Sequence, residues 1–192
     1  SLTFGIVFLG KQAIADEYYA KSKAYKNLWN DEVQWFRAKD DAGNWAAWQG
    51  KTVHGQGCRE SNPYQQGWFV PHDVPGLVEL MGRAHFTAEL VALFDNTPSD
   101  FLWNDYYNHA NEPVHQVPFL FNEIGMPWLT QKWTRTICDK AYGADRYGIC
   151  GNEDVGQMSA WYVLAAMGIH PINPGDGKYQ ITSPVFNKVE VQ

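Results

Sequence analysis

Polar and acidic residues gather in three short clusters, each at the junction between a loop and an expected helix. The clusters are residues 59–66 (RESNPYQQ), 108–115 (NHANEPVH) and 152–157 (NEDVGQ). Two acids that face each other across a polar pocket are the minimum for cleaving a glycosidic bond. Amide and carboxylate oxygens without thiolate ligands suit a hard cation such as calcium. The residue types therefore fit glycoside hydrolysis and a calcium site.

Each cluster also has an ordinary structural interpretation. Asn111 stands where a plain N-cap would stand, and Asn152 or Asp154 can cap the apolar helix that follows. Glu60 can be a solvated loop acid. The two histidines of the second cluster, six positions apart, form a weak metal-binding pattern and can equally be core residues. No single cluster shows whether its residues have a structural or a catalytic role.

The composition excludes several classes of function. The 192 residues suffice for one domain or part of a larger one, and 45% of them are hydrophobic. A net charge of −6 without a run of Lys or Arg argues against nucleic acids and anionic membranes as partners. No segment reaches the roughly 18–20 apolar residues of a membrane helix. The sequence therefore predicts neither a nucleic-acid partner nor a membrane partner.

Two further features of the composition leave alternatives open. The aromatic content of 15% suits stacking on sugar rings or dense packing between helices. The three cysteines, Cys58, Cys138 and Cys150, lack metal-type spacing and are expected to be buried free thiols. A single bridge from Cys150 to one of the others remains an alternative.

Hydrophobic periodicity predicts a mainly α fold. We expect helices over residues 12–29, 73–81, 84–94, 112–122, 127–142 and 155–167, a hairpin turning at 40–44, and strands over 179–182 and 185–191. Residues 155–167 are nearly all apolar and are expected to be buried on most sides. Residues 1–10 begin as a helical pattern under way and the last residues end within a strand pattern, which suggests a piece of a longer chain.

Helices in antiparallel pairs fit part of an (α/α)6 toroid in residues 1–170. Residues 171–192 would form the start of a C-terminal β segment. A helix bundle or an α-solenoid is the alternative architecture.

Taken together, the motifs resemble the catalytic half of glycoside hydrolase family 92. They are Glu60-x-Asn62-x-x-Gln65 with residues 68–77 (WFVPHDVPGL), His109-x-Asn111-Glu112-Pro113-x-His115, and residues 151–163 (GNEDVGQMSAWYV). The order of the motifs and the spacing within each match the family, and the third is specific by itself. The resemblance extends over essentially the whole chain. Members of this family are calcium-dependent, exo-acting α-mannosidases.

The resemblance implies a role for each acid. The general acid of the family falls on Glu60, and the base that activates water for a single inverting displacement falls on Asp154. The family often has Asp at the position of Asn152, a departure that weakens any role of this position as base. An inverting pair requires a gap of about 6.5–9.5 Å between its carboxyl groups. Rings such as Tyr64 and Trp68 are expected to exclude water from the acid.

The resemblance also implies ligands. Asn111 and Glu112 would bind Ca²⁺, which would hold the hydroxyls of a mannose residue in the glycan substrate. The remaining motif residues would contact the sugar, and these are Asn152, Glu153, Gln65, His109 and His115.

Family members are far longer than this chain and carry an N-terminal β-sandwich, so the resemblance implies a missing domain. By analogy, the enzyme would be secreted or periplasmic. A non-catalytic sugar-binding or structural α/α domain is one alternative, favoured by Asn152. An α/α-toroid glycosidase or lyase that acts on other sugars without calcium is the other.

Overall fold

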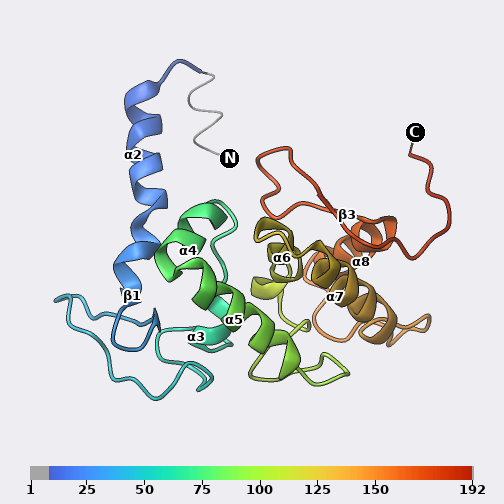
Figure 1. Cartoon of the computed structure of the whole chain (residues 1–192), viewed down its shortest axis with the longest axis horizontal. Helices are drawn as coiled ribbons and strands as arrows, with labels where there is room; N and C mark the ends of the chain where they lie inside the picture. The colour runs from blue at the N-terminus through green and yellow to red at the C-terminus, as the bar shows by residue number, and fades with distance from the viewer. Residues whose placement is uncertain (1–8, 192) are drawn as a thin grey trace.

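The computed structural model describes residues 9–191 and is mainly helical (Figure 1). The helical pattern expected over residues 1–10 lies almost wholly outside the described residues. The elements are α2 (Gln12–Ser22), η1 (Ala24–Leu28), β1 (Trp29–Asn30), β2 (Trp35–Phe36), α3 (Pro63–Gln66), α4 (Val74–Met81), α5 (Arg83–Asp95), η2 (Glu112–Val114), η3 (Val117–Phe119), α6 (Leu120–Glu123), α7 (Pro127–Lys140), α8 (Gln157–Met167), β3 (Ile169–His170) and β4 (Gln180–Ile181). Helix α2 projects from the rest, and α6, α7 and α8 lie together at the opposite side (Figure 1).

Five of the expected helices are confirmed as α2 with η1, α4, α5, α7 and α8. Pro75 and Pro127 stand in the first turns of α4 and α7, where a missing N–H costs no hydrogen bond. The continuous helix expected over residues 112–122 is wrong. Pro118 lacks the N–H that a continuous helix would need at that position, and the segment forms the short turns η2, η3 and α6.

Aromatic side chains build the core on the side of α3, α4 and α5. Trp35 packs edge to face on Tyr64 and on Trp68, with ring centroids 5.2 Å apart in both pairs. Trp68 meets Phe86 of α5 at 5.3 Å. The Trp35 indole N–H donates to the Pro63 carbonyl at 2.7 Å, which fixes the otherwise irregular residues 51–71 to the core. Of the two uses expected for the high aromatic content, these rings therefore serve dense packing.

Two small antiparallel sheets complete the fold. Strand β1 pairs with β2, and an isolated bridge from Lys39 to Trp45 closes the predicted turn at 40–44. Strand β3 pairs with β4, as expected near residues 179–182. The strand expected over residues 185–191 is wrong. The Val185 N–H donates to the Ala166 carbonyl at 2.8 Å, so this segment packs on the end of α8 and pairs with no strand among residues 9–191.

Helix α8 buries only one of its faces. Met158, Trp161, Ala165 and Ala166 face the core. Val163 is 52% exposed, so the expectation that residues 155–167 are buried on most sides is wrong. No other described segment of this chain covers that face.

The second and third clusters meet through their backbones. A Cβ atom placed on Gly151 would lie 2.3 Å from the carbonyl oxygen of Ala110 and 2.6 Å from its Cα. Only glycine permits this approach, because it has no Cβ. The contact places the loop before α8 directly beside the loop that carries Asn111 and Glu112.

Asp73 joins the N-terminal helices to α4. It occupies the N-cap position of α4, but its side chain does not cap the helix. Its carboxylate instead accepts a hydrogen bond from the Tyr25 hydroxyl at 2.7 Å and pairs with Lys23 at 2.8 Å. Burial by itself would raise the pKa of Asp73, but the bonds from Lys23 and Tyr25 outweigh it and hold that pKa below its usual value.

We expect Gly151→Ala to destabilise this chain by about 1–3 kcal/mol, because the new methyl group forces two backbones apart. Urea unfolding measures the effect. Gly177→Ala is the control: its φ is +70° and nothing lies within 4 Å of the added Cβ, so it reports only the cost of a left-handed backbone. Because Gly151 is not left-handed, a stability of Gly151→Ala unchanged from wild type would contradict its close-approach role.

We expect Asp73→Asn to lower the free energy of unfolding by about 1.5–3 kcal/mol near pH 7, the range for hydrogen bonds to charged groups. The folded-state pKa lies below the unfolded value of about 3.8–3.9, so the carboxylate stabilises the fold above that value. The difference from wild type should therefore shrink as the pH falls below about 4. Urea unfolding at several pH values measures it.

The matched control for Asp73 is Glu17→Gln. Glu17 pairs with Lys21 on the exposed side of α2, where solvent screens the interaction, so its stability should change little at any pH. A pH-independent loss in Asp73→Asn would contradict the role of its charge.

Candidate active site

One open cavity of about 380 Å³ collects residues from all three polar clusters. Its walls are formed by Arg59, Glu60, Phe69, Asn111, Glu112, Pro113, Asp154 and Gln157. Both candidate catalytic acids and both candidate metal ligands therefore border the same space, although 94 positions separate the first acid from the last.

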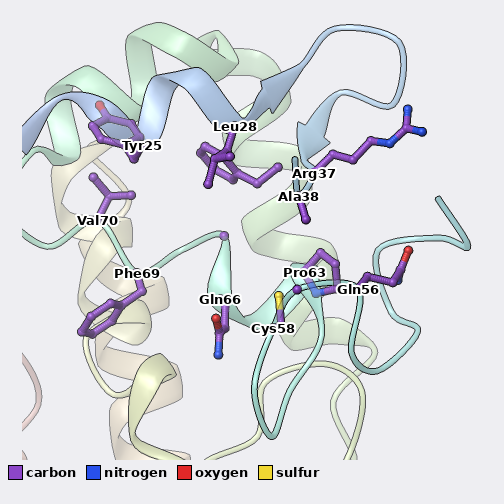
Figure 2. Close-up of a pocket in the computed structure, with 13 residues that line it drawn as sticks. Tyr25, Leu28, Arg37, Ala38, Gln56, Cys58, Pro63, Gln66, Phe69 and Val70 are labelled. Atoms are coloured by element: carbon purple, nitrogen blue, oxygen red, sulfur yellow. The ribbon is translucent and has the colours of Figure 1, made fainter. Parts of the chain in front are cut away.

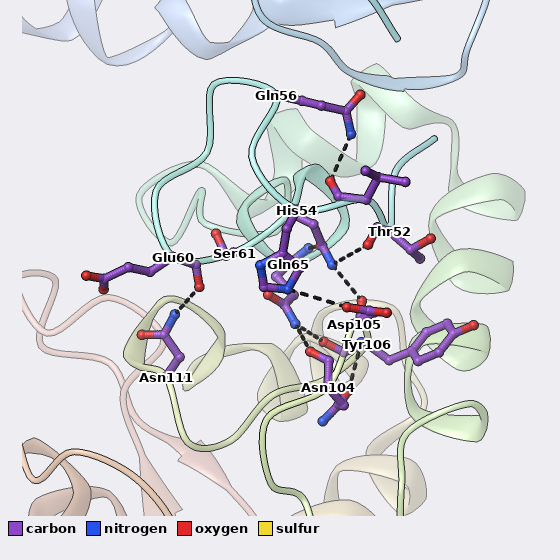
Figure 3. Close-up of polar contacts among 12 residues, drawn as sticks. Thr52, His54, Gln56, Glu60, Ser61, Gln65, Asn104, Asp105, Tyr106 and Asn111 are labelled. Carbon is purple, nitrogen blue, oxygen red and sulfur yellow. Dashed lines mark hydrogen bonds and ion pairs between the residues drawn. The ribbon is translucent and has the colours of Figure 1, made fainter. Parts of the chain in front are cut away.

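Glu60 reaches the cavity from an irregular loop that is tied down at several points. Its own φ is +57°, a left-handed conformation that is uncommon outside glycine. Two residues later, the Asn62 side chain caps α3 by accepting from the Gln65 N–H at 2.9 Å. The Asn111 amide donates weakly to the Glu60 carbonyl at 3.4 Å (Figure 3). The Glu60 carboxylate itself is exposed, as general acid chemistry on a bound ligand requires.

Asp154 lies in a strained turn at the start of α8. Its φ is +45°, the next residue, Val155, has φ +60°, and Gly156 has φ +92°. A left-handed β-branched residue is a true outlier, and strain of this kind concentrates at functional sites.

The helix cap expected at Asn152 or Asp154 is wrong. Gly156 holds the N-cap position of α8 without a side-chain hydrogen bond. Glu153 meets the helix instead, since its Oε1 accepts from the Ser159 N–H at 3.3 Å. The Asp154 carboxylate is exposed and turned to the cavity rather than to the helix.

Glu112 carries the clearest electrostatic signal at the cavity. Burial raises the pKa of its carboxyl group, and the nearby carboxylates of Asp154 and Glu60 raise it further. Its Oε1 is buried without a hydrogen-bond partner among the described residues. The neighbouring acids thus disfavour the charge of Glu112, which also has an unsatisfied buried oxygen, and a cation would stabilise such an environment.

Asn111 and Glu112 are the residues that suit a metal ion. The Asn111 side chain does not cap η2, and its NH₂ group is directed to Glu60, so its amide oxygen keeps its lone pairs. Amide and carboxylate oxygens fit a hard cation. Within residues 9–191, no three His, Cys, Asp or Glu side chains are close enough together to hold a metal ion. These two residues are therefore a partial ligand set.

Gln65, His109 and His115 lie beneath the cavity and do not border it. Gln65 is buried and donates through Nε2 to the carbonyls of Asn104 at 2.6 Å and Tyr106 at 2.9 Å (Figure 3). The structure therefore brings these three residues near the site without exposing them to a ligand.

Both histidines are enclosed by hydrogen-bonding neighbours. His109 lies between the hydroxyls of Tyr107 at 2.8 Å and Tyr142 at 2.7 Å. His115 contacts the His109 carbonyl at 3.0 Å. Burial lowers the pKa of His109 well below its ordinary value and that of His115 to about 4, so both rings are neutral at pH 7.

Asn152 is exposed and Glu153 is half-buried, and neither borders the cavity. Tyr64 and Trp68, expected to exclude water from Glu60, belong to the aromatic core instead. The ring at the cavity is Phe69, which is 56% exposed. Hydrophobic periodicity could not identify this ring, because Phe69 stands in a segment without regular structure. Only the structure shows that it is exposed between the buried Trp68 and Val70.

Phe69 also borders a second cavity of about 200 Å³, shown in Figure 2. Tyr25, Leu28, Pro63 and Val70 contribute to its mainly apolar walls. No acid among residues 9–191 lines it, whereas Glu60, Glu112 and Asp154 border the first cavity.

Comparison with known proteins supports a single family. The profile described as "Glycosyl hydrolase family 92 catalytic domain" matches residues 7–192. A curated protein of Arthroderma benhamiae, described as an uncharacterized secreted glycosidase, is 30% identical over 96% of this chain and 26% of its own length. None of the helices within residues 9–191 is long and apolar enough to cross a membrane.

Solved structures agree. A family GH92 α-mannosidase of Bacteroides thetaiotaomicron superposes with a TM-score of 0.87 and 34% identity, over 95% of this chain and 24% of that one. A second GH92 protein of Bacteroides thetaiotaomicron VPI-5482, described as an inverting mannosidase, gives a TM-score of 0.76 and 37% identity, over 94% of this chain and 27% of that one. This chain thus spans about a quarter of the length of these relatives, and across that span it belongs to glycoside hydrolase family 92.

Proposed function

We propose that this chain supplies the acid, the base and part of a calcium site to an enzyme that removes terminal α-linked mannose from glycans by single-displacement hydrolysis. The observation that carries the proposal is the single cavity onto which Glu60, Glu112 and Asp154 converge. The likeness to GH92 mannosidases, one of them solved with mannoimidazole, supports a mannose-containing glycan as the substrate.

The two exposed acids divide the proton transfers. Glu60 donates a proton to the departing glycosidic oxygen. Asp154 accepts a proton from a water molecule whose oxygen attacks the anomeric carbon from the opposite face, so the product has inverted configuration. The strained turn places the Asp154 carboxylate at the cavity, while Glu153 accepts the hydrogen bond from the first turn of α8 that would stabilise a carboxylate's charge and weaken it as a base.

Asn111 and Glu112 would hold a calcium ion through their side-chain oxygens. The unsatisfied Glu112 Oε1 and the raised Glu112 pKa favour a cation at this wall. Bound there, calcium supplies a positive charge that orients sugar hydroxyls. Two protein ligands fall short of the six to eight oxygens that calcium takes, so water, substrate or other parts of the enzyme complete its coordination.

The active unit in this proposal is a longer, secreted or periplasmic enzyme. The relatives are about four times as long as this chain, since it covers 24–27% of them. The remaining chain would complete an (α/α)6 toroid and add an N-terminal β-sandwich. The exposed face of α8, with Val163 half exposed, provides a surface against which further helices would pack.

We expect Glu60→Gln and Asp154→Asn in the longer enzyme each to lower turnover by about 10²–10⁴-fold, the usual contribution of a positioned acid or base. The Glu60 variant should recover on substrates with good leaving groups, which need no proton, whereas the Asp154 variant should not. Steady-state kinetics on mannosides with different leaving groups measures this split.

Glu32→Gln, on an exposed turn away from the cavity, is the control and should retain full turnover. NMR of the first-formed product identifies its anomer. Retained configuration, or a Glu60 variant equally impaired on every leaving group, would overturn the assignment.

We expect a calcium chelator to abolish turnover and added Ca²⁺ to restore it. Asn111→Ala and Glu112→Gln should weaken calcium binding by at least about tenfold, because even groups behind metal ligands change affinity by roughly 10–100-fold. Isothermal titration calorimetry measures the affinity, with the exposed Glu123→Gln as control. Full activity in chelator would instead favour a glycosidase or lyase of another sugar class.

A further inference from the structure

We propose that Gln157 presents its carboxamide oxygen to the active-site cavity as an acceptor for an O–H group, and that His115 is the positioning residue that fixes this orientation. The inference rests on the proposed function only for the identity of the O–H donor, a hydroxyl of the sugar or the attacking water. The orientation itself follows from the buried hydrogen bonds of the two motif histidines.

The donor and the acceptor of each hydrogen bond can be assigned by starting from groups that can play only one of these two roles. The Tyr142 hydroxyl donates its single proton to the Met158 carbonyl at 3.1 Å. It must therefore accept from His109 Nε2, 2.7 Å away, which carries a hydrogen. The other ring nitrogen, Nδ1, then accepts from the Tyr107 hydroxyl at 2.8 Å. The chain runs in one direction, from Tyr107 through His109 and Tyr142 to α8.

His115 is assigned in the same way. Its Nε2 lies 3.0 Å from the His109 carbonyl, which can only accept, so Nε2 carries the hydrogen. Its Nδ1 is then an acceptor, and Gln157 Nε2 lies 3.2 Å from it. The backbone of His115 is also held, because the Trp161 indole N–H donates to the His115 carbonyl at 2.8 Å.

This sequence of bonds fixes the Gln157 amide. Only its NH₂ group can donate to His115, so its oxygen is directed away from the ring, on a side chain that borders the cavity. A carboxylate at this position would meet the His115 lone pair and would add a third negative charge beside Glu112 and Asp154, which border the same cavity. A neutral acceptor avoids both costs.

Two acids border the cavity with Gln157, and Glu112 and Asp154, when ionised, only accept hydrogen bonds. Of the two N–H donors on these walls, Asn111 donates to the Glu60 carbonyl, and within residues 9–191 neither it nor Arg59 is hydrogen-bonded to Gln157. We therefore infer that a bound molecule brings the proton donor. A sugar hydroxyl and a water molecule share the O–H chemistry, and the experiments below separate them.

NMR of the histidine side chains tests the orientation without any turnover. Histidine-labelled ¹⁵N spectra of this chain at pH 7 distinguish protonated from bare ring nitrogens. We expect Nε2–H and bare Nδ1 for His109 and His115. His170 is the internal control with the opposite tautomer, because its Nδ1 lies 2.7 Å from the Pro171 carbonyl and must carry the hydrogen. A protonated Nδ1 at His115 would overturn the proposal.

Two substitutions of His115 separate positioning from folding. Asn places an acceptor where Nδ1 stood, whereas Gln keeps a donor toward the His109 carbonyl and loses that acceptor. We expect His115→Asn to retain most of the turnover and His115→Gln to lose it by about 3- to 10-fold, the size of one neutral hydrogen bond. Urea unfolding of both variants gives their stabilities, and a loss of turnover that merely follows stability in the pair would contradict the positioning role.

Gln157→Met removes the acceptor at similar volume and identifies the donor. Weaker binding of mannoimidazole together with a raised KM assigns the sugar hydroxyl, whereas a lowered kcat with unchanged inhibitor affinity assigns the water. A variant unchanged in all three quantities overturns the proposal. If the wild-type enzyme releases no mannose, the proposed function fails while the tautomer result stands alone.

Discussion

The site depends on a contact between two backbones, Gly151 against Ala110. Side-chain contacts adjust over an ångström or more, but two packed main chains leave no such freedom. This contact sets how far the loop of Asn111 and Glu112 lies from the turn of Asp154. Both of these segments contribute acids to the cavity. The contact also explains why a glycine opens the third motif, where the neighbouring residues are large and polar.

A buried, neutral hydrogen-bond network supports the charged surface above it. His109 and His115 connect η2 to the first turn of α8 without contributing charge, because burial keeps both rings neutral. The charges are confined to the cavity wall, where Glu112, Asp154 and Glu60 face solvent or a ligand. Separating neutral scaffold from charged surface lets the acids repel one another without destabilising the core. The two histidines thereby act through other residues, although the motif alone suggests direct contact with the sugar.

The sequence predicts this molecule well where information is local. Apolar periodicity and the prolines at 75 and 127 locate the main helices, and the three motifs correctly indicate which distant loops carry polar groups. It fails where tertiary contacts decide. Residues 185–191 have a composition typical of a strand, but they pack on the end of α8 and do not pair with a strand. Asp154 is a residue type that favours helix N-caps, yet the left-handed turn directs its side chain to the cavity. The faces of Phe69 and Val163 likewise depend on neighbours that periodicity does not reveal.

The turn at Asp154, Val155 and Gly156 has a consequence for how the family can vary. Three successive left-handed residues set the direction in which the chain enters α8, and each contributes a rotation that its neighbours cannot compensate. Inserting or deleting one residue there would swing the Asp154 carboxylate to another side of the helix. Substitution at the fully exposed Val155 is far less disruptive by comparison. The turn therefore tolerates a change of side chain at Val155 better than any change in its length.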